Sequence, residues 1–354
     1  MRTTISLSAK GHAMTLSNTR AMHTAEPGGA FVRTQVTTPP PGAGHVRVTV
    51  EACGVCHSDA MITGGLLPGT TFPLTTGHEI AGRIESVGDG VDGWALGQRV
   101  AVGWYGGSCG YCDACRDGDG INCAKLQIPG VAYPGGFADS VVVPAIALAA
   151  IPDELSAVEA APLACAGVTV FNALRRSAAR AGDVVAILGL GGLGHLGVQF
   201  AHHMGFVTVA IARGAEKSSL AKQLGSDYYI DSTTDNVAHA LQSLGGAKVI
   251  LATVTNGEAM TATFDGLGRR GELVIVGATP DLLQLSGLQF INNTKKIYGH
   301  ASGTALDIEE TMRFAAQTGV RAWTEEAPLD DAGTAFEKML TGKARFRMVL
   351  TTGN

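Results

Sequence analysis

Residues 184–212 include no Asp, Glu, Lys or Arg, and this limits strongly what the stretch can form. A membrane-spanning helix would also lack charge, but the stretch holds six glycines and three histidines. Segments buried on both faces of a parallel sheet have the same composition. The pattern predicts a strand at 184–188, a glycine turn, a helix with Leu193, Leu196, Phe200 and Met204 on one face, and a strand at 207–212. Apolar runs at 248–254 and 272–277 continue the alternation, so we expect a doubly wound parallel α/β sheet.

The glycine turn, GLGGLG, follows the first of these strands directly and opens the helix. Between a strand and a helix, such a turn is typical of dinucleotide binding. Its glycines let backbone N–H groups approach a pyrophosphate, which the helix N-terminus attracts. A glycine turn without a ligand is the alternative, and this context disfavours it. The predicted phosphate-binding residues are Gly189, Gly191, Gly192 and Gly194.

The end of the second strand distinguishes the two nicotinamide cofactors. An acidic residue there binds the ribose hydroxyls of NAD, whereas an arginine nearby accommodates the 2′-phosphate of NADP. Here Ala212 stands where the acid is expected, and Arg213 and Lys217 follow it. A guanidinium can hold a phosphate through two parallel hydrogen bonds. The sequence therefore favours NADP(H) over NAD(H), unless Arg213 and Lys217 are ordinary solvated charges.

Four cysteines lie close together in CGYCDACRDGDGINC, with two, two and seven residues between them. Thiols at this spacing can close around one tetrahedral zinc ion, and a site closed by four protein ligands is structural. The odd total of seven cysteines also favours metal binding in a reducing compartment over disulfides. We expect a structural zinc that fastens a loop with little core, held by Cys109, Cys112, Cys115 and Cys123.

Three further candidate ligands, Cys56, His78 and Cys165, are scattered along the chain. Two thiolates and one imidazole leave one position of a tetrahedron open, which is the arrangement of a catalytic zinc. Taken singly, each of them could be a buried packing residue. Because Cys165 lies near the start of the nucleotide-binding part, we expect a metal held by all three to lie between the domains. A chain with both sites binds two zinc ions.

A chain of 354 residues is expected to form two domains. Strands are predicted at 45–52, 79–87, 99–104 and 140–143, with no helix of ordinary length before about residue 155. After residue 302, helices at 307–316 and 332–340 flank a short strand, and a strand at 345–350 ends the pattern. This tail is too small for its own core. We therefore predict a β-rich domain, 1–164 completed by 302–354, and a nucleotide-binding domain, 165–301.

The net charge of −5 argues against a nucleic-acid partner, which would require a basic face. No segment is a convincing membrane span, and we expect a cytoplasmic protein. The first 25 residues carry three basic and no acidic side chains, but they lack the repeated arginines of a transit peptide. We expect them to form a poorly ordered extension.

These motifs together resemble the zinc-dependent alcohol dehydrogenases of the medium-chain dehydrogenase/reductase superfamily. GVCHSD, TGHE, the four-cysteine stretch, LACAGVT and GLGGLG occur in the family's order between about residues 45 and 215, and GKARFR at 342–347 extends the resemblance. The resemblance implies a GroES-like catalytic domain and a Rossmann domain. It assigns Cys56, His78 and Cys165 to the catalytic zinc. It also implies hydride transfer between a primary alcohol or aldehyde and a nicotinamide cofactor.

The same resemblance implies roles for residues around the metal. Asp59 would orient the ring of His78, and Glu79 would be a second carboxylate able to approach the metal. Ser58 would bond the substrate oxygen and begin a proton relay. Trp104 would wall the substrate pocket, His57 and Arg347 would lie near the cofactor pyrophosphate, and Thr169 would lie near the nicotinamide.

Two features depart from the family pattern. Met61 stands where well-studied members carry the last histidine of the proton relay, so the proton would leave by another route. Cys53 is a seventh cysteine, to which we assign no metal.

A polyol or formaldehyde-conjugate dehydrogenase would differ only in substrate. A zinc-free quinone or enoyl reductase is opposed by the intact ligand set, and a non-enzymatic nucleotide-binding protein would need no open metal position. The family forms dimers and tetramers, so we expect a homo-oligomer.

Overall fold

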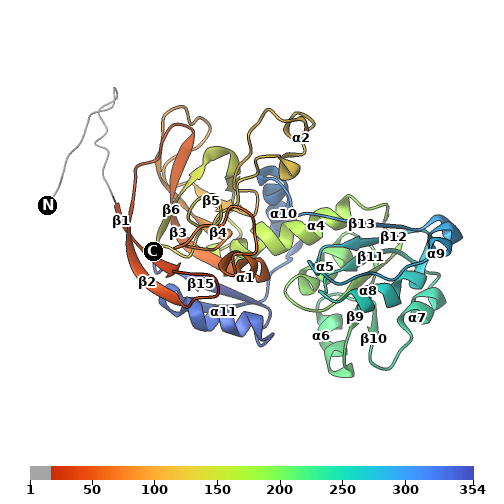
Figure 1. The fold of residues 1–354 in the computed structure, drawn as a ribbon. Helices are drawn as coiled ribbons and strands as arrows, with labels where there is room; N and C mark the ends of the chain where they lie inside the picture. The colour runs from red at the N-terminus through yellow and green to blue at the C-terminus, as the bar shows by residue number, and fades with distance from the viewer. Residues whose placement is uncertain (1–16) are drawn as a thin grey trace. The chain divides into compact units, whose positions relative to one another are not determined.

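The computed structural model describes residues 17–354, which divide into two compact units (Figure 1). The first, here called the β unit, contains the described residues up to Cys165 together with Gly303–Arg313 and Trp323–Asn354. The second, here called the α/β unit, contains Ala166–Ser302 and Phe314–Ala322.

The assignment of residues 314–322 differs from the sequence prediction, which gave all of 302–354 to the β-rich domain. Helix α10 (Ala305–Thr318) contributes Phe314, whose ring centroid lies 5.2 Å from that of Phe171 and 5.9 Å from that of Phe200. This aromatic cluster belongs to the core of the α/β unit, so the C-terminal end of α10 packs there.

The β unit is built on a sheet with the strand order β14-β15-β3-β4-β5-β7, and β6 also pairs with β3. The core lies against β3, where Val46, Val48 and Val50 are fully buried. All four strands predicted in this part are confirmed, with ends moved by a few residues. The strands are β3 (His45–Val55), β4 (Glu79–Val87), β5 (Arg99–Val102), β6 (Ser140–Pro144), β7 (Ala149–Ala150), β14 (Thr324–Pro328) and β15 (Arg347–Thr351), and the helices here are α1 (His57–Thr63), α2 (Asp113–Arg116) and α11 (Ala332–Leu340).

An antiparallel hairpin of β1 (Ser17–Thr24) and β2 (Phe31–Thr38) precedes this sheet, drawn in red and orange in Figure 1. The expected poorly ordered extension over residues 1–25 is therefore wrong for β1; its remaining part, 1–16, lies outside the described residues. The N–H of Met22 donates to the carbonyl of Phe137 (2.9 Å), and Arg20 pairs with Asp139 (2.7 Å). These long-range contacts hold β1, and no local pattern in the sequence reveals them.

The α/β unit has parallel strands in the order β10-β9-β8-β11-β12-β13. The order reverses between β8 and β11, which makes their carboxyl ends a topological switch point. The predicted doubly wound Rossmann sheet is confirmed. The strands are β8 (Val184–Leu188), β9 (Val207–Ala212), β10 (Tyr228–Asp231), β11 (Ala247–Ala252), β12 (Leu267–Ile275) and β13 (Lys296–Gly299), and the helices are α4 (Val168–Arg175), α5 (Gly194–His203), α6 (Ser218–Gln223), α7 (Val237–Ser243), α8 (Gly257–Thr263) and α9 (Gly287–Ile291).

One continuous helical stretch, Ala157–Arg175, joins α3 (Ala157–Pro162), a single π-helical turn (Leu163–Gly167) and α4. By length and composition it is apolar enough to cross a membrane, but 83% of its most apolar window is buried inside the protein. Core helices of globular proteins have this character. The π turn contains Cys165, and such turns are frequent at functional sites.

Candidate active site and metal centres

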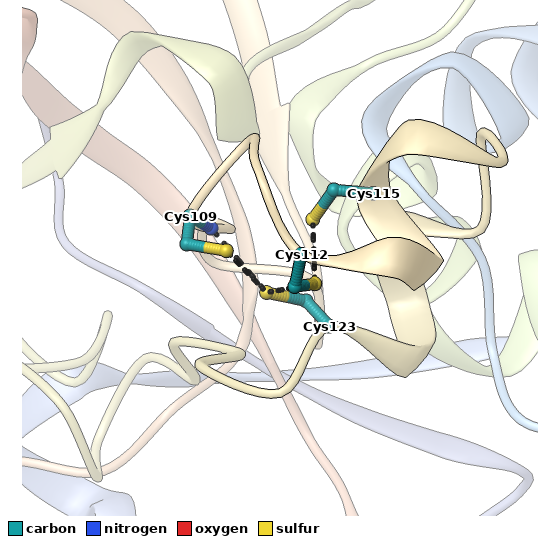
Figure 2. Close-up of side chains that lie close together, drawn as sticks. All are labelled: Cys109, Cys112, Cys115 and Cys123. Carbon is teal, nitrogen blue, oxygen red and sulfur yellow. Dashed lines mark hydrogen bonds between the residues drawn. The ribbon is translucent and has the colours of Figure 1, made fainter.

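Four thiols converge in the loop that carries α2 (Figure 2). The Sγ atoms of Cys112 and Cys115 are 3.5 Å apart, those of Cys109 and Cys123 3.6 Å, and those of Cys112 and Cys123 3.8 Å. Tetrahedral thiolates bonded to zinc at about 2.3 Å stand about 3.8 Å from one another. The predicted quartet is therefore brought together, and its donor set fits a closed structural zinc.

Backbone N–H groups favour the charged state of two of these sulfurs, those of Cys112 and Cys123. The amides of Cys109 and Lys125 each donate to Cys123 Sγ at 3.3 Å. Hydrogen bonds from the backbone at Cys115 and Ala124 lower the pKa of the Cys112 thiol to about 6. Helix α2 itself has no buried residue, so packing of this helix contributes little to holding the loop.

A second cluster, Cys56, His78, Glu79 and Cys165, is fully within the β unit, and its donor atoms lie within 4.8 Å of one another. Cys56 precedes α1, and Cys165 lies in the π turn. Glu79 is the first residue of β4, and His78 directly precedes it. All four side chains are buried. The three ligands predicted from the sequence thus meet, although 109 positions separate the first from the last.

The carboxylate of Asp59 fixes how His78 faces this cluster. Asp59 Oδ1 lies 3.1 Å from His78 Nδ1 and accepts from Thr76 Oγ1 (2.8 Å) and the Gly77 N–H (3.2 Å). Its Oδ2 accepts from the Cys56 N–H at 2.8 Å. With Nδ1 engaged, His78 Nε2 is left buried and without a partner among the described residues. This is the contact expected of a residue that orients a metal-binding histidine.

The two thiols of the cluster are not equivalent. A hydrogen bond shared with Cys165, together with the nearby His78, lowers the pKa of the Cys56 thiol well below its usual range. The same shared bond and burial raise the pKa of the Cys165 thiol. One sulfur is therefore readily ionised, and a cation in the cluster would stabilise the ionised form of both.

Glu79 forms a buried ion pair with Arg347 of β15. Burial raises the pKa of Glu79, and the positive charge of Arg347 lowers it. Burial is the larger effect, so the pKa rises to about 7. The pair engages Glu79 Oε1, and Oε2 has no partner among the described residues. Gly54 faces Glu79 across the β3–β4 pair, where a Cβ would lie 1.9 Å from Oε2.

The resemblance placed Arg347 near a pyrophosphate, but here its side chain is 3% exposed.

The remaining residues predicted around the metal differ in exposure. The ring of Trp104 is half-buried and stands edge-on to His78, with centroids 5.1 Å apart. Ser58 is half-buried and His57 exposed in the first turn of α1. Cys53 belongs to neither of the two thiol clusters and lies in the hydrophobic core, where burial raises its pKa well above the usual thiol value.

The predicted cofactor residues of the α/β unit, apart from Thr169, follow the carboxyl ends of its strands. The glycine turn joins β8 to α5, and a Cβ on Gly194 would stand 1.9 Å from the carbonyl oxygen of Gly189. Gly191 is exposed and would meet nothing within 4 Å, so the backbone there is open to a phosphate group. Arg213 is exposed directly after β9, and Lys217 is half-buried. Thr169, on α4, is 8% exposed.

Two family models match the chain. The alcohol dehydrogenase GroES-like domain covers residues 42–153, and the zinc-binding dehydrogenase model covers residues 192–317. The chain is similar to the alcohol dehydrogenase notN of Aspergillus sp., with 41% identity over 88% of this chain and 91% of the relative.

Two similar solved structures hold different cofactors. The structure of CAD from Helicobacter pylori complexed with NADP(H) shares 25% identity over 95% of this chain and 98% of that one, with a TM-score of 0.85. The acetophenone reductase from Geotrichum candidum in complex with NAD shares 27% identity over 94% of this chain and 97% of that one, with a TM-score of 0.82.

Proposed function

The chain belongs to the alcohol dehydrogenases of the medium-chain dehydrogenase/reductase superfamily, and from this premise we propose that it transfers hydride between a primary alcohol or aldehyde and NADP(H) with the help of zinc. The observation that carries this proposal is the buried cluster of two thiols, an imidazole and a carboxylate. A cluster that served only for packing would not leave His78 Nε2 buried without a partner, because such a group costs about 1–3 kcal/mol.

Cys56, His78 and Cys165 would hold the catalytic zinc, which acts when bound as a Lewis acid on the substrate oxygen. His78 would offer Nε2, because Asp59 occupies Nδ1. Arg347 anchors the carboxylate of Glu79 through Oε1, so Glu79 is held beside the three ligands. Cys109, Cys112, Cys115 and Cys123 would hold the second, structural zinc.

Ser58 would accept the proton that the alcohol hydroxyl loses, and Trp104 would exclude water from one side of the substrate. Met61, in the next turn of α1, has no titratable group, so the proton would continue from Ser58 to solvent through water. The nicotinamide, when bound, supplies the hydride acceptor. Thr169 and His57 remain predicted cofactor contacts, whereas the guanidinium of Arg347 is buried against Glu79.

Ser58→Ala is expected to lower kcat by about 10²-fold while the zinc content stays at the wild-type value. The variant removes the proton acceptor but no metal donor, and positioned proton transfer contributes typically about 10²–10⁴-fold. Steady-state kinetics beside metal analysis make the comparison. An unchanged kcat would remove Ser58 from the mechanism.

Preference for NADP(H) is expected to appear as a higher kcat/KM with NADP(H) than with NAD(H). The support is Ala212 in place of an acid and the exposed guanidinium of Arg213 beside it. Arg213→Ala is expected to lower kcat/KM for NADPH by roughly 10–100-fold and to change that for NADH little, because charge-assisted bonds contribute about 1.5–3 kcal/mol. A wild-type preference for NADH would overturn the cofactor assignment.

The activity itself is tested by a screen of alcohols, aldehydes and ketones with both cofactors, before and after removal of metal by a chelator. We expect turnover of primary alcohols or aldehydes that chelation abolishes and added zinc restores. Turnover only of polyols or of formaldehyde conjugates would select that alternative. Reduction of quinones or enoyl compounds that survives chelation would refute the zinc-dependent proposal.

We further propose a cytoplasmic homo-oligomer, a dimer or a tetramer, acting on small molecules. The cytoplasmic assignment is supported by the seven cysteines, all of which lie in the described residues and are free thiols. Free thiols persist in a reducing compartment.

A further inference from the structure

The loop that follows β9 is held by two side chains of β10, the strand beside it. Both backbone polar groups of Gly214 are engaged: its N–H donates to Asp231 Oδ1 at 2.9 Å, and its carbonyl accepts from the Tyr229 hydroxyl at 2.6 Å. Gly214 has φ +88° and ψ 133°, a conformation that side chains other than glycine rarely adopt. The bend of the loop is therefore defined by three residues, Gly214, Tyr229 and Asp231.

Asp231 and Tyr229 are themselves well fixed. Asp231 Oδ1 also accepts from Thr233 N (2.9 Å) and Thr233 Oγ1 (2.7 Å), and these bonds lower the pKa of Asp231. The Tyr229 hydroxyl also lies 3.3 Å from the carbonyl of Ala212. Since Asp231 pairs with Ala212 in the β9–β10 register, the contacts form a clamp across two neighbouring strands.

The clamped loop carries two basic residues, Arg213 and Lys217, and one acid, Glu216. Arg213 is exposed and has no ion-pair partner among the residues that the structure describes. Glu216, the nearby acid, folds back so that its carboxylate oxygen would lie 2.2 Å from a Cβ on Gly214. The guanidinium is therefore available to bind a ligand beside the end of β9. In this fold, the protein recognises the 2′ position of the cofactor ribose there.

We propose that Tyr229 and Asp231 are positioning residues that determine how Arg213 distinguishes a 2′-phosphate from a 2′-hydroxyl; this rests on the proposed preference for NADP(H). Two parallel bonds from an arginine to a phosphate depend on geometry, and a fixed backbone narrows the positions that the guanidinium can take. Loosening Gly214 lets the Arg213 backbone move, so discrimination falls while the glycine turn that binds the pyrophosphate stays intact.

Tyr229→Phe removes one hydroxyl from the clamp, and Tyr228→Phe is its matched control. Tyr228 precedes Tyr229 on the same strand, and its side chain is 47% exposed. The probes are 2′,5′-ADP and 5′-AMP, titrated against the zinc-loaded enzyme. We expect Tyr229→Phe to reduce the preference for 2′,5′-ADP by about fivefold and Tyr228→Phe to leave it at the wild-type value. An unchanged preference in Tyr229→Phe would overturn the proposal.

Variants of Asp231 provide a second test of the clamp. Asp231→Asn keeps an oxygen that can accept from the Gly214 N–H, whereas Asp231→Ala does not. We expect the preference to fall in the alanine variant and to recover largely in the asparagine variant. The KM for NADPH should rise more than kcat falls, since the reacting groups are untouched. Equal losses in both variants would contradict positioning through the Gly214 N–H.

These measurements separate the proposal from the cofactor assignment. If the wild-type protein binds 5′-AMP as tightly as 2′,5′-ADP, the preference for NADP(H) is wrong. In that case the clamp has no discrimination to determine, and the proposal fails together with the cofactor assignment. If the wild type prefers 2′,5′-ADP and Tyr229→Phe matches it, the clamp is wrong and the cofactor assignment stands.

Discussion

Cys165→Ala is expected to reduce kcat/KM by at least about a thousandfold and to remove one of the two zinc ions from each chain. The variant takes away one sulfur of the buried cluster, and Lewis-acid stabilisation is worth several kcal/mol. The four-thiol loop shares no ligand with this cluster, so its zinc should remain. Metal analysis with kinetics on the same preparation measures both effects.

Cys53→Ala is the matched control for this loss. Cys53 is a buried thiol, 1% exposed, that belongs to the core and to neither metal cluster. We expect both zinc ions and nearly full activity in Cys53→Ala, with a modest loss of stability from the small cavity. Full activity in Cys165→Ala, or loss of a zinc in Cys53→Ala, would refute the ligand assignment.

Cys112→Ser is expected to remove the other zinc ion and to lower the melting temperature by roughly 5–10 °C. Helix α2 has no buried side chain, so we expect an ion held by the four sulfurs to fasten this loop. Differential scanning calorimetry and metal analysis measure the change. The protein that remains folded at low temperature should keep most of its turnover, because no residue of the buried cluster is altered.

The variants Cys165→Ala and Cys112→Ser are compared by both turnover and melting temperature, because each is expected to affect mainly one of the two. Cys165→Ala should abolish turnover and lower the melting temperature less than Cys112→Ser does, whereas Cys112→Ser should keep most of its turnover. If Cys112→Ser abolished turnover in folded protein at unchanged stability, the four-thiol loop would not be the structural site proposed here.

Features that depend on neighbours in the chain could be predicted from the sequence. The four-thiol loop needs only thiols at short spacing, and the glycine turn needs only a strand before it and a helix after it. Strands buried on both faces, such as β8 and β9, were also predicted with correct ends, because a run of apolar residues bounded by glycine marks them.

Features at the edges of the sheets could not be predicted in this way. The outer strands β10 and β13 of the α/β unit carry charged and exposed residues, so their sequences resemble loops. Strand β1 is held by backbone bonds to distant segments, and the end of α10 by aromatic contacts to α4 and α5. The apolar pattern of a segment does not say which core it joins.

The sequence by itself determined the class of fold, the thiols that come together and the glycine turn between β8 and α5, because each follows from residue types at short range or from motifs in a familiar order. Only the tertiary structure decided which distant groups form an ion pair or a hydrogen bond. Glu79 and Arg347 are 268 positions apart and meet only because β3 pairs with both β4 and β15. Likewise, Tyr229 and Asp231 reach Gly214 only because β10 pairs with β9, and these pairings set the environment of both candidate sites.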